Sequence, residues 1–247
     1  MTEKNDRVPA SAMVIMAHPD DAEFTMAGTV ASWVRRGCRV VYVLCTDGNA
    51  GSHEPGMTRE RLAEIRRAEQ RAACAVLGVS EVIFLGHDDG QLMPTLALRR
   101  ELVELLRRHK PEVVFTGDPT TLFGGDAYIN HPDHRAAAQA ALDAVSPACA
   151  MPLLWPEVGA PHRVRRVYVH SFEHANTWVD IGETMEVKLE ALRKHASQMG
   201  EWDPTEMITN WAAETGKEKG LTHAEAFRVI TLERDEEPEA PPEADKA

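Results

Sequence analysis

The sequence predicts an α/β fold, in a three-layer, Rossmann-like arrangement with a mostly parallel sheet. Two observations carry this prediction. Short apolar runs, such as AMVIMA (12–17) and RVVYVLCT (39–46), alternate with segments whose apolar residues recur at helical spacing, which is the pattern of βαβ units. The runs are also almost continuously apolar, as expected for parallel strands that helices cover on both faces.

The predicted elements follow one another along the chain in this alternation. After the first run, an amphipathic stretch from Ala22 to Arg36 ends before Gly37, a residue type that suits the end of a helix. Helical spacing returns over residues 59–77 and ends at Gly78. The remaining expected strands are 81–86, 111–117, 165–172, 177–181 and 226–232, and the remaining expected helices are 96–109, 135–145, 183–198 and 204–216.

The pattern predicts one domain followed by a short tail. A chain of 247 residues is long enough for one large domain, and no linker separates the later elements from the first ones. We therefore expect a single domain over residues 1–232. Residues 233–247 are rich in proline and carry seven acidic and two basic side chains. Without hydrophobic periodicity, this acidic tail is expected to be disordered.

Charge and cysteine content exclude several classes of protein. The formal net charge is −12, of which the tail contributes −5, so −7 remains for the domain. A domain with this net charge is not expected to bind nucleic acid or an anionic membrane through a basic surface. The four cysteines form no CxxC pair and indicate no disulfide framework. Because the sequence also shows no signal-peptide segment and no apolar run long enough for a membrane span, we expect a cytoplasmic protein.

Polar side chains follow the first predicted strand directly, in the motif HPDD (18–21). In open α/β sheets, ligands bind beyond the carboxyl ends of the strands. The nucleotide fingerprint GxGxxG is absent at this turn. His18, Asp20 and Asp21 instead offer one imidazole and two carboxylates, which are groups that bind metals or move protons.

A second motif, HPDH (131–134), follows a later strand and opens a predicted helix. The spacing of three puts His131 and His134 on one face of a helical first turn. A hydrolytic zinc site needs three nitrogen or oxygen ligands and one open position; a pair from HPDD and one histidine from HPDH would supply them, leaving a base and an acid. Each motif alone also fits a helix cap or an ordinary turn. Their joint occurrence at two strand ends favours the metal site.

The two motifs resemble those of the N-acetylglucosaminyl deacetylase superfamily, which includes the LmbE-like bacterial proteins. Four further segments are similar to that family: RRAEQRAACAVLGV (66–79), LGHDDGQL (85–92), KLEALRKHASQM (188–199) and AEAFRV (224–229). The resemblance extends from about residue 12 to residue 232. It implies a zinc-dependent hydrolase that removes the N-acetyl group from an N-acetylglucosamine-type amino sugar or its conjugate.

The resemblance also implies roles for individual side chains. By their position in the motifs, His18, Asp21 and His134 are the implied zinc ligands. Asp20 is the implied general base that activates the water molecule. His131 is expected to protonate the leaving amine or to stabilise the tetrahedral oxyanion.

Further residues of the family's motifs concern the substrate and the surroundings of the site. Arg66 and Asp89 match positions that hold sugar hydroxyls in relatives. Asn49 stands where many family members have an acid, so the substrate rim is expected to differ. His195 would either reach the cleft or face the carbonyls at a helix end. Asp133 would either orient His131 by accepting a hydrogen bond from its imidazole or be an ordinary acid at a helix start.

The sequence leaves three alternatives open. Within the same chemistry, the chain could be an amidase that removes a larger acyl group from a thiol–sugar conjugate. A non-catalytic sugar- or nucleotide-binding module of the same fold is the alternative from another class. The third alternative concerns the metal, because iron(II) accepts two histidines and a carboxylate, as Zn²⁺ does.

The expected partners are a small amino sugar and further copies of the chain in a homo-oligomer, a trimer or hexamer. Neither nucleic acid nor a membrane is expected.

Overall fold

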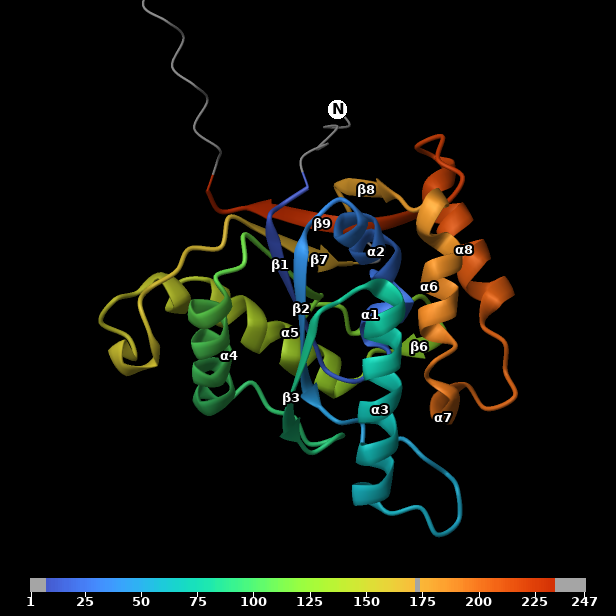
Figure 1. The fold of residues 1–247 in the computed structure, drawn as a ribbon, viewed down its shortest axis with the longest axis horizontal. Helices are drawn as coiled ribbons and strands as arrows, with labels where there is room; N and C mark the ends of the chain where they lie inside the picture. The colour runs from blue at the N-terminus through green and yellow to red at the C-terminus, as the bar shows by residue number, and fades with distance from the viewer. Residues whose placement is uncertain (1–7, 172–173, 234–247) are drawn as a thin grey trace, which may run out of the picture.

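A central, mostly parallel sheet organises the molecule (Figure 1). The computed structural model describes residues 8–171 and 174–233, and within them seven strands pair in the order β3-β2-β1-β4-β7-β9-β8. Of these strands, β9 alone runs in the direction opposite to the other six. This confirms the predicted fold class. The strands are β1 (Ser11–Met16), β2 (Arg39–Thr46), β3 (Glu81–His87), β4 (Val113–Gly117), β7 (Arg166–His170), β8 (Thr177–Asp180) and β9 (Ala224–Thr231).

Helices cover both faces of the sheet. Figure 1 shows α4 and α5 on one side of the sheet and α2, α3 and α6 on the other. Met13 and Ile15 of β1 pack with the first group, whereas Ala12 and Val14 pack with residues of α2 and α3. Successive side chains of a strand point to opposite faces, which explains why the runs are continuously apolar. The helices are α1 (Asp21–Thr25), α2 (Ala27–Arg35), α3 (Arg59–Leu77), α4 (Leu96–His109), α5 (Pro132–Val145), α6 (Met185–Leu192), α7 (Ala196–Met199) and α8 (Thr205–Lys217).

The first predicted helix, 22–36, is divided into α1 and α2 at Met26. The second of these helices is capped from a distant strand. The backbone amides of Gly28 and Thr29 donate to the carboxylate of Glu225 in β9, at 3.0 and 2.7 Å. This carboxylate satisfies amides that a helix start leaves without partners, so a new helix can begin here.

Two other segments also differ from the prediction. The predicted helix 183–198 is divided into α6 and α7, and His195 lies directly before α7. Between β4 and α5, a short hairpin forms from β5 (Phe123–Gly124) and β6 (Tyr128–Ile129). Strands of two residues are too short for any periodicity to indicate them.

One buried cation holds the irregular segment 148–159. Arg107 in α4 is 2% exposed, and its guanidinium donates to six backbone carbonyls at 2.6–3.3 Å. It thereby satisfies backbone acceptors that no sheet ladder pairs. The six carbonyls belong to Ala148, Cys149, Met151, Leu154, Trp155 and Gly159.

Three predictions about the rest of the chain have different outcomes. The acidic tail was expected at 233–247, and residues 234–247 lie outside the described residues. The four cysteines are free and buried, as expected without a disulfide framework. In the described part of the chain, no helix is both long and apolar enough to cross a membrane.

Candidate active site

The HPDD motif forms a tight turn between β1 and α1. The backbone amide of His18 donates to Asp21 Oδ2 at 2.8 Å, which closes the turn. Asp20 has a backbone φ of 90°, a left-handed conformation that is uncommon for a residue with a side chain. The turn places all three polar residues of the motif at the carboxyl end of β1, as predicted.

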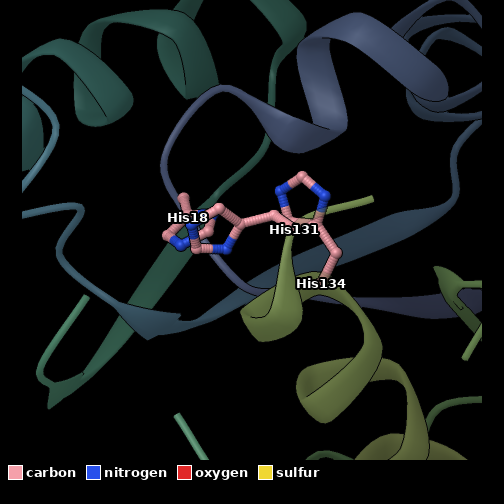
Figure 2. Close-up of side chains that lie close together, drawn as sticks. All are labelled: His18, His131 and His134. Atoms are coloured by element: carbon pink, nitrogen blue, oxygen red, sulfur yellow. The ribbon is translucent and has the colours of Figure 1, made fainter. Parts of the chain in front are cut away.

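The HPDH motif brings two more imidazoles from the start of α5. His131 is the N-cap residue, and its Nδ1 accepts a hydrogen bond from the amide of Asp133 at 3.2 Å. Pro132 occupies the first turn, where a missing amide hydrogen costs nothing. Figure 2 shows His131 and His134 beside His18. The ring centroids are separated by 4.9 Å (His18–His131), 5.1 Å (His18–His134) and 5.4 Å (His131–His134), so the two motifs converge as predicted.

The carboxylate of Asp21 lies between two imidazoles. Its Oδ1 is 3.0 Å from His134 Nε2, and its Oδ2 is 3.6 Å from His18 Nδ1. The other nitrogen of His134, Nδ1, is 2.9 Å from Asn130 Oδ1, and Asn130 Nδ2 donates to the carbonyl of Thr121 at 2.9 Å. Because that donation turns the amide oxygen toward the imidazole, a neutral His134 carries its proton on Nδ1. In this neutral form the lone pair of Nε2 is available to a cation on the side of Asp21, whereas the protonated imidazole donates from Nε2 to the Asp21 carboxylate.

Two buried carboxylates hold the far side of His18. Its Nε2 is 3.0 Å from Asp89 Oδ1 and 3.3 Å from Asp133 Oδ2, so Nε2 carries a proton, and a neutral His18 keeps its lone pair on Nδ1. Asp133 also accepts from the amides of Gly90 at 2.7 Å and Leu92 at 3.2 Å. The expectation that Asp133 orients the first histidine of HPDH is wrong. Its carboxylate points into the turn after β3 and orients His18 instead.

The electrostatics of the cluster call for a positive charge beside Asp21. Burial alone would raise the pKa of Asp21, but the imidazoles of His134 and His18 hold it well below its usual value. Burial would lower the pKa of His134, and the Asp21 carboxylate raises it. Desolvation raises the pKa of Asp20 to about 6, although Arg66 opposes this shift. Either protons on the imidazoles or a bound cation can supply the charge that Asp21 needs.

Arg66 of α3 holds the turn from the side of Asp20. Its side chain is 5% exposed and donates to Asp20 Oδ2 at 3.0 Å, to the carbonyl of Pro19 at 2.6 Å and to the carbonyl of Gly48 at 3.0 Å. A Cβ atom at residue 48 would lie 2.1 Å from Arg66 Nη1, so only glycine leaves room for the guanidinium. The residue predicted to bind sugar hydroxyls thus contacts the predicted base directly.

The other residues named from the sequence lie around this centre. Asp89 contacts His18, as described. Asn49 joins two loops, because its amide donates to Asp88 at 3.2 Å and accepts from the amide of Asp89 at 3.2 Å. His195 is fully buried, and its Nε2 lies 3.3 Å from Glu23 Oε2, so its imidazole is not exposed at the site. Burial would lower the pKa of His195, and the Glu23 carboxylate raises it.

Sequence reasoning missed two residues that touch the site. Asn130 fixes the tautomer of His134, and Gln70 Oε1 accepts a hydrogen bond from the backbone amide of Asp20 at 3.1 Å. The available signals were positional. Asn130 directly precedes HPDH, and Gln70 lies four residues after Arg66, on the same face of α3.

Comparison with known proteins decides the family. Residues 13–145 match the PIG-L family, described as GlcNAc-PI de-N-acetylase. The chain belongs to the PIG-L family. It is 33% identical over 226 residues to a diacetylchitobiose deacetylase of Thermococcus kodakarensis, with 88% of this chain and 82% of the relative covered. It is 28% identical to 1D-myo-inositol 2-acetamido-2-deoxy-alpha-D-glucopyranoside deacetylase 1 of Saccharopolyspora erythraea, with 90% of each covered. Among solved structures, the N,N'-diacetylchitobiose deacetylase from Pyrococcus horikoshii has a TM-score of 0.84 at 28% identity, with 94% of this chain and 87% of that chain covered.

Membership of the PIG-L family confirms the resemblance seen in the sequence. The matched segment includes both histidine motifs, Arg66, Gln70 and Asp89. The relatives named above are deacetylases, which are hydrolases of amide bonds. His195 lies outside the segment that matches the PIG-L family.

Proposed function

We propose that this chain is a metal-dependent hydrolase that removes the N-acetyl group from a GlcNAc-type amino sugar or its conjugate. One observation carries the proposal: two ring nitrogens, His18 Nδ1 and His134 Nε2, face the Asp21 carboxylate, with Asp20 and His131 beside them. The family supports amide hydrolysis, and the names of the relatives support an N-acetylated amino sugar as the substrate class.

The donor set fits a divalent cation. We assign His18 Nδ1, the Asp21 carboxylate and His134 Nε2 as its ligands, because the opposite ring nitrogen of each histidine faces an acceptor and a neutral imidazole then leaves these atoms for the cation. Two imidazoles and one carboxylate suit Zn²⁺, with iron(II) as the alternative. The buried carboxylates on His18 and the amide of Asn130 fix the tautomers that such ligation requires. A cation bound there lowers the pKa of a water molecule and polarises the amide carbonyl.

Asp20 and His131 would carry the proton transfers. The Asp20 side chain is 14% exposed, with Arg66 on Oδ2, and it is our general base for the attacking water. Because the amide of Asp133 donates to His131 Nδ1, a neutral His131 keeps its proton on Nε2 and can donate a hydrogen bond to the carbonyl oxygen as negative charge develops. This favours the oxyanion role of His131. The proton taken by Asp20 is then available for the leaving amine.

We infer two further properties from the resemblance. Arg66 and Asp89 remain our predicted substrate-binding residues. In the site, Arg66 also contacts Asp20, and Asp89 also contacts His18. A cytoplasmic homo-oligomer, a trimer or hexamer, is the predicted assembly, and sedimentation analysis of the purified protein checks its size.

A substrate panel tests the proposed function. The purified protein, loaded with Zn²⁺ or with iron(II), is incubated with free, phosphorylated, lipid-linked and thiol-linked N-acetylglucosamine compounds, and released acetate is measured. We expect turnover of at least one of them and none of an acetyl-lysine peptide. Release of a larger acyl group from a thiol–sugar conjugate alone would support the amidase alternative. Sugar binding without any turnover would support the non-catalytic module, and equal turnover of acetyl-lysine would refute the sugar assignment.

A further inference from the structure

A chain of buried polar groups leads from the backbone of Asp20 to His195. The backbone amide of Asp20 donates to Gln70 Oε1 at 3.1 Å, and Gln70 Nε2 donates to Glu23 Oε1 at 2.9 Å. The second oxygen of Glu23 lies 3.3 Å from His195 Nε2. Gln70, Glu23 and His195 are each 0% exposed, so none of the three touches a substrate.

This chain has a defined direction. The carboxylate of Glu23 offers only acceptors, so the NH₂ group of Gln70 faces Glu23 and its oxygen faces the amide of Asp20. A fully buried carboxylate is costly unless a polar or cationic group compensates it, and His195 is the imidazole that lies against Glu23. The Glu23–His195 pair therefore determines which end of the Gln70 amide reaches Asp20.

Asp20 is the residue that needs such a support. Its backbone φ of 90° and ψ of −27° are unfavourable for a residue with a Cβ atom, and such conformations persist only where the surroundings hold them. Arg66 holds the Asp20 side chain, and Gln70 holds its backbone. Both come from the same face of α3, one helical turn apart.

The late motif HASQ (195–198) holds this arrangement together. Ser197 donates from its amide and its hydroxyl to the two oxygens of Glu69 in α3, at 2.7 and 2.6 Å. Gln198 Nε2 donates to the carbonyl of Gly51 at 3.2 Å. Three residues of one short motif thus contact α1, α3 and the loop after β2, and the proposed reaction uses none of them.

We propose that Gln70 is the positioning residue for Asp20, and that the buried Glu23–His195 pair fixes the orientation of the Gln70 amide. The inference rests on the proposed function, in which Asp20 is the general base. The HASQ motif then contributes to catalysis indirectly, because its His195 contacts Glu23, Glu23 accepts from Gln70, and Gln70 accepts from the Asp20 amide.

Exchanging the two partners tests this inference. Gln70→Glu sets two carboxylates against each other, whereas Gln70→Met removes the polar end without adding charge. The double variant Gln70→Glu with Glu23→Gln restores a donor opposite an acceptor and leaves an amide oxygen for His195. Gln139→Glu is the matched control, because Gln139 also donates to a carboxylate, that of Asp143, at 2.8 Å on an exposed helix face.

The expected result is a loss of kcat with little else changed. For Gln70→Glu and Gln70→Met we expect kcat to fall roughly 10- to 100-fold, the size of effect that a small misplacement of a reacting group produces. KM and bound metal should stay within about twofold of wild type, since Gln70 touches neither substrate nor ligands. The double variant should recover most of the lost kcat, and Gln139→Glu should match wild type.

Other outcomes overturn the inference. It fails if Gln70→Met, folded and loaded with metal, keeps full kcat, or if the exchange of partners rescues nothing. Inactivity of the wild type on the whole panel would be a failure of the proposed function instead. Amide hydrogen exchange at Asp20 tests the positioning without any turnover: Gln70→Met should accelerate exchange at this amide about tenfold or more, and unchanged exchange would refute the support by Gln70.

Discussion

The neighbours Asp20 and Asp21 have the same chemistry but different surroundings, so substituting each by asparagine should have different effects. In Asp20→Asn, the amide oxygen can still accept the hydrogen bond from Arg66, which is 3.0 Å long in the structure. The turn should therefore survive, and only the base is lost. Loss of a general base slows turnover by about 10²–10⁴, which corresponds to about 3–5 kcal/mol in the activation free energy. Metal content should stay at the wild-type level.

Asp21→Asn should have the opposite effect. Its carboxylate lies 3.0 Å from His134 Nε2 and 3.6 Å from His18 Nδ1, and the substitution removes the negative charge that these nitrogens share. Even a lost partner of a ligand weakens metal binding about 10- to 100-fold, so the loss of a ligand should weaken it by at least that factor. Turnover should fall in proportion to the metal lost and recover partly when metal is added in excess.

The assay measures metal per chain by mass spectrometry beside acetate release, for the same preparations. Asp88→Asn is the control, since Asp88 is an acid near the site whose side chain is 58% exposed and pairs with Arg59. If Asp20→Asn loses the metal while Asp21→Asn keeps it, the two roles are reversed. If His131→Ala loses the metal and Asp21→Asn does not, the cation is held by the three imidazoles, which lie close enough to hold one.

Three more perturbations check other parts of the structure. Asn130→Leu should leave the His134 tautomer unfixed and weaken metal binding about 10- to 100-fold; unchanged affinity in a metal titration would contradict the tautomer argument. Arg107→Met should lower the free energy of unfolding by about 3 kcal/mol or more, because several buried carbonyls lose a charged donor. Urea unfolding beside the exposed control Arg108→Met measures this, and equal stability of the two variants would refute it. Desolvation lowers the pKa of His170 from 6.5 to about 4. The unfolded chain therefore binds this proton first, the free energy of unfolding should fall as pH drops from 6.5 to 4, and His170→Gln should show a shallower fall over that range.

The strands could be predicted because each is a continuous apolar run covered on both faces, as β1 illustrates. The division of the first helix could not, because Glu225 caps the second part from about two hundred residues away in the sequence. Local periodicity contains no information about such a partner. The same holds for the hairpin before α5, whose strands of two residues are too short to show a period.

The candidate site was predictable to the extent that strand topology decides it. Two motifs at the ends of β1 and β4 had to meet, because parallel neighbouring strands end at the same edge of the sheet. The pairing of individual side chains was not predictable. Asp133 binds His18 rather than His131, and Gln70 reaches Asp20 through side-chain directions that only the packed helix determines.

The backbone conformation of Asp20 sets activity against stability. A left-handed residue with a side chain costs about 1–3 kcal/mol, a strain that glycine would avoid. Natural selection for stability alone would therefore favour glycine at this position, and an aspartate persists only while the carboxylate is useful. Descendants of this gene that are released from catalysis are free to exchange it. A glycine aligned with Asp20 in a sequence that keeps both histidine motifs would thus mark a protein that retains the metal and the fold but has given up the reaction.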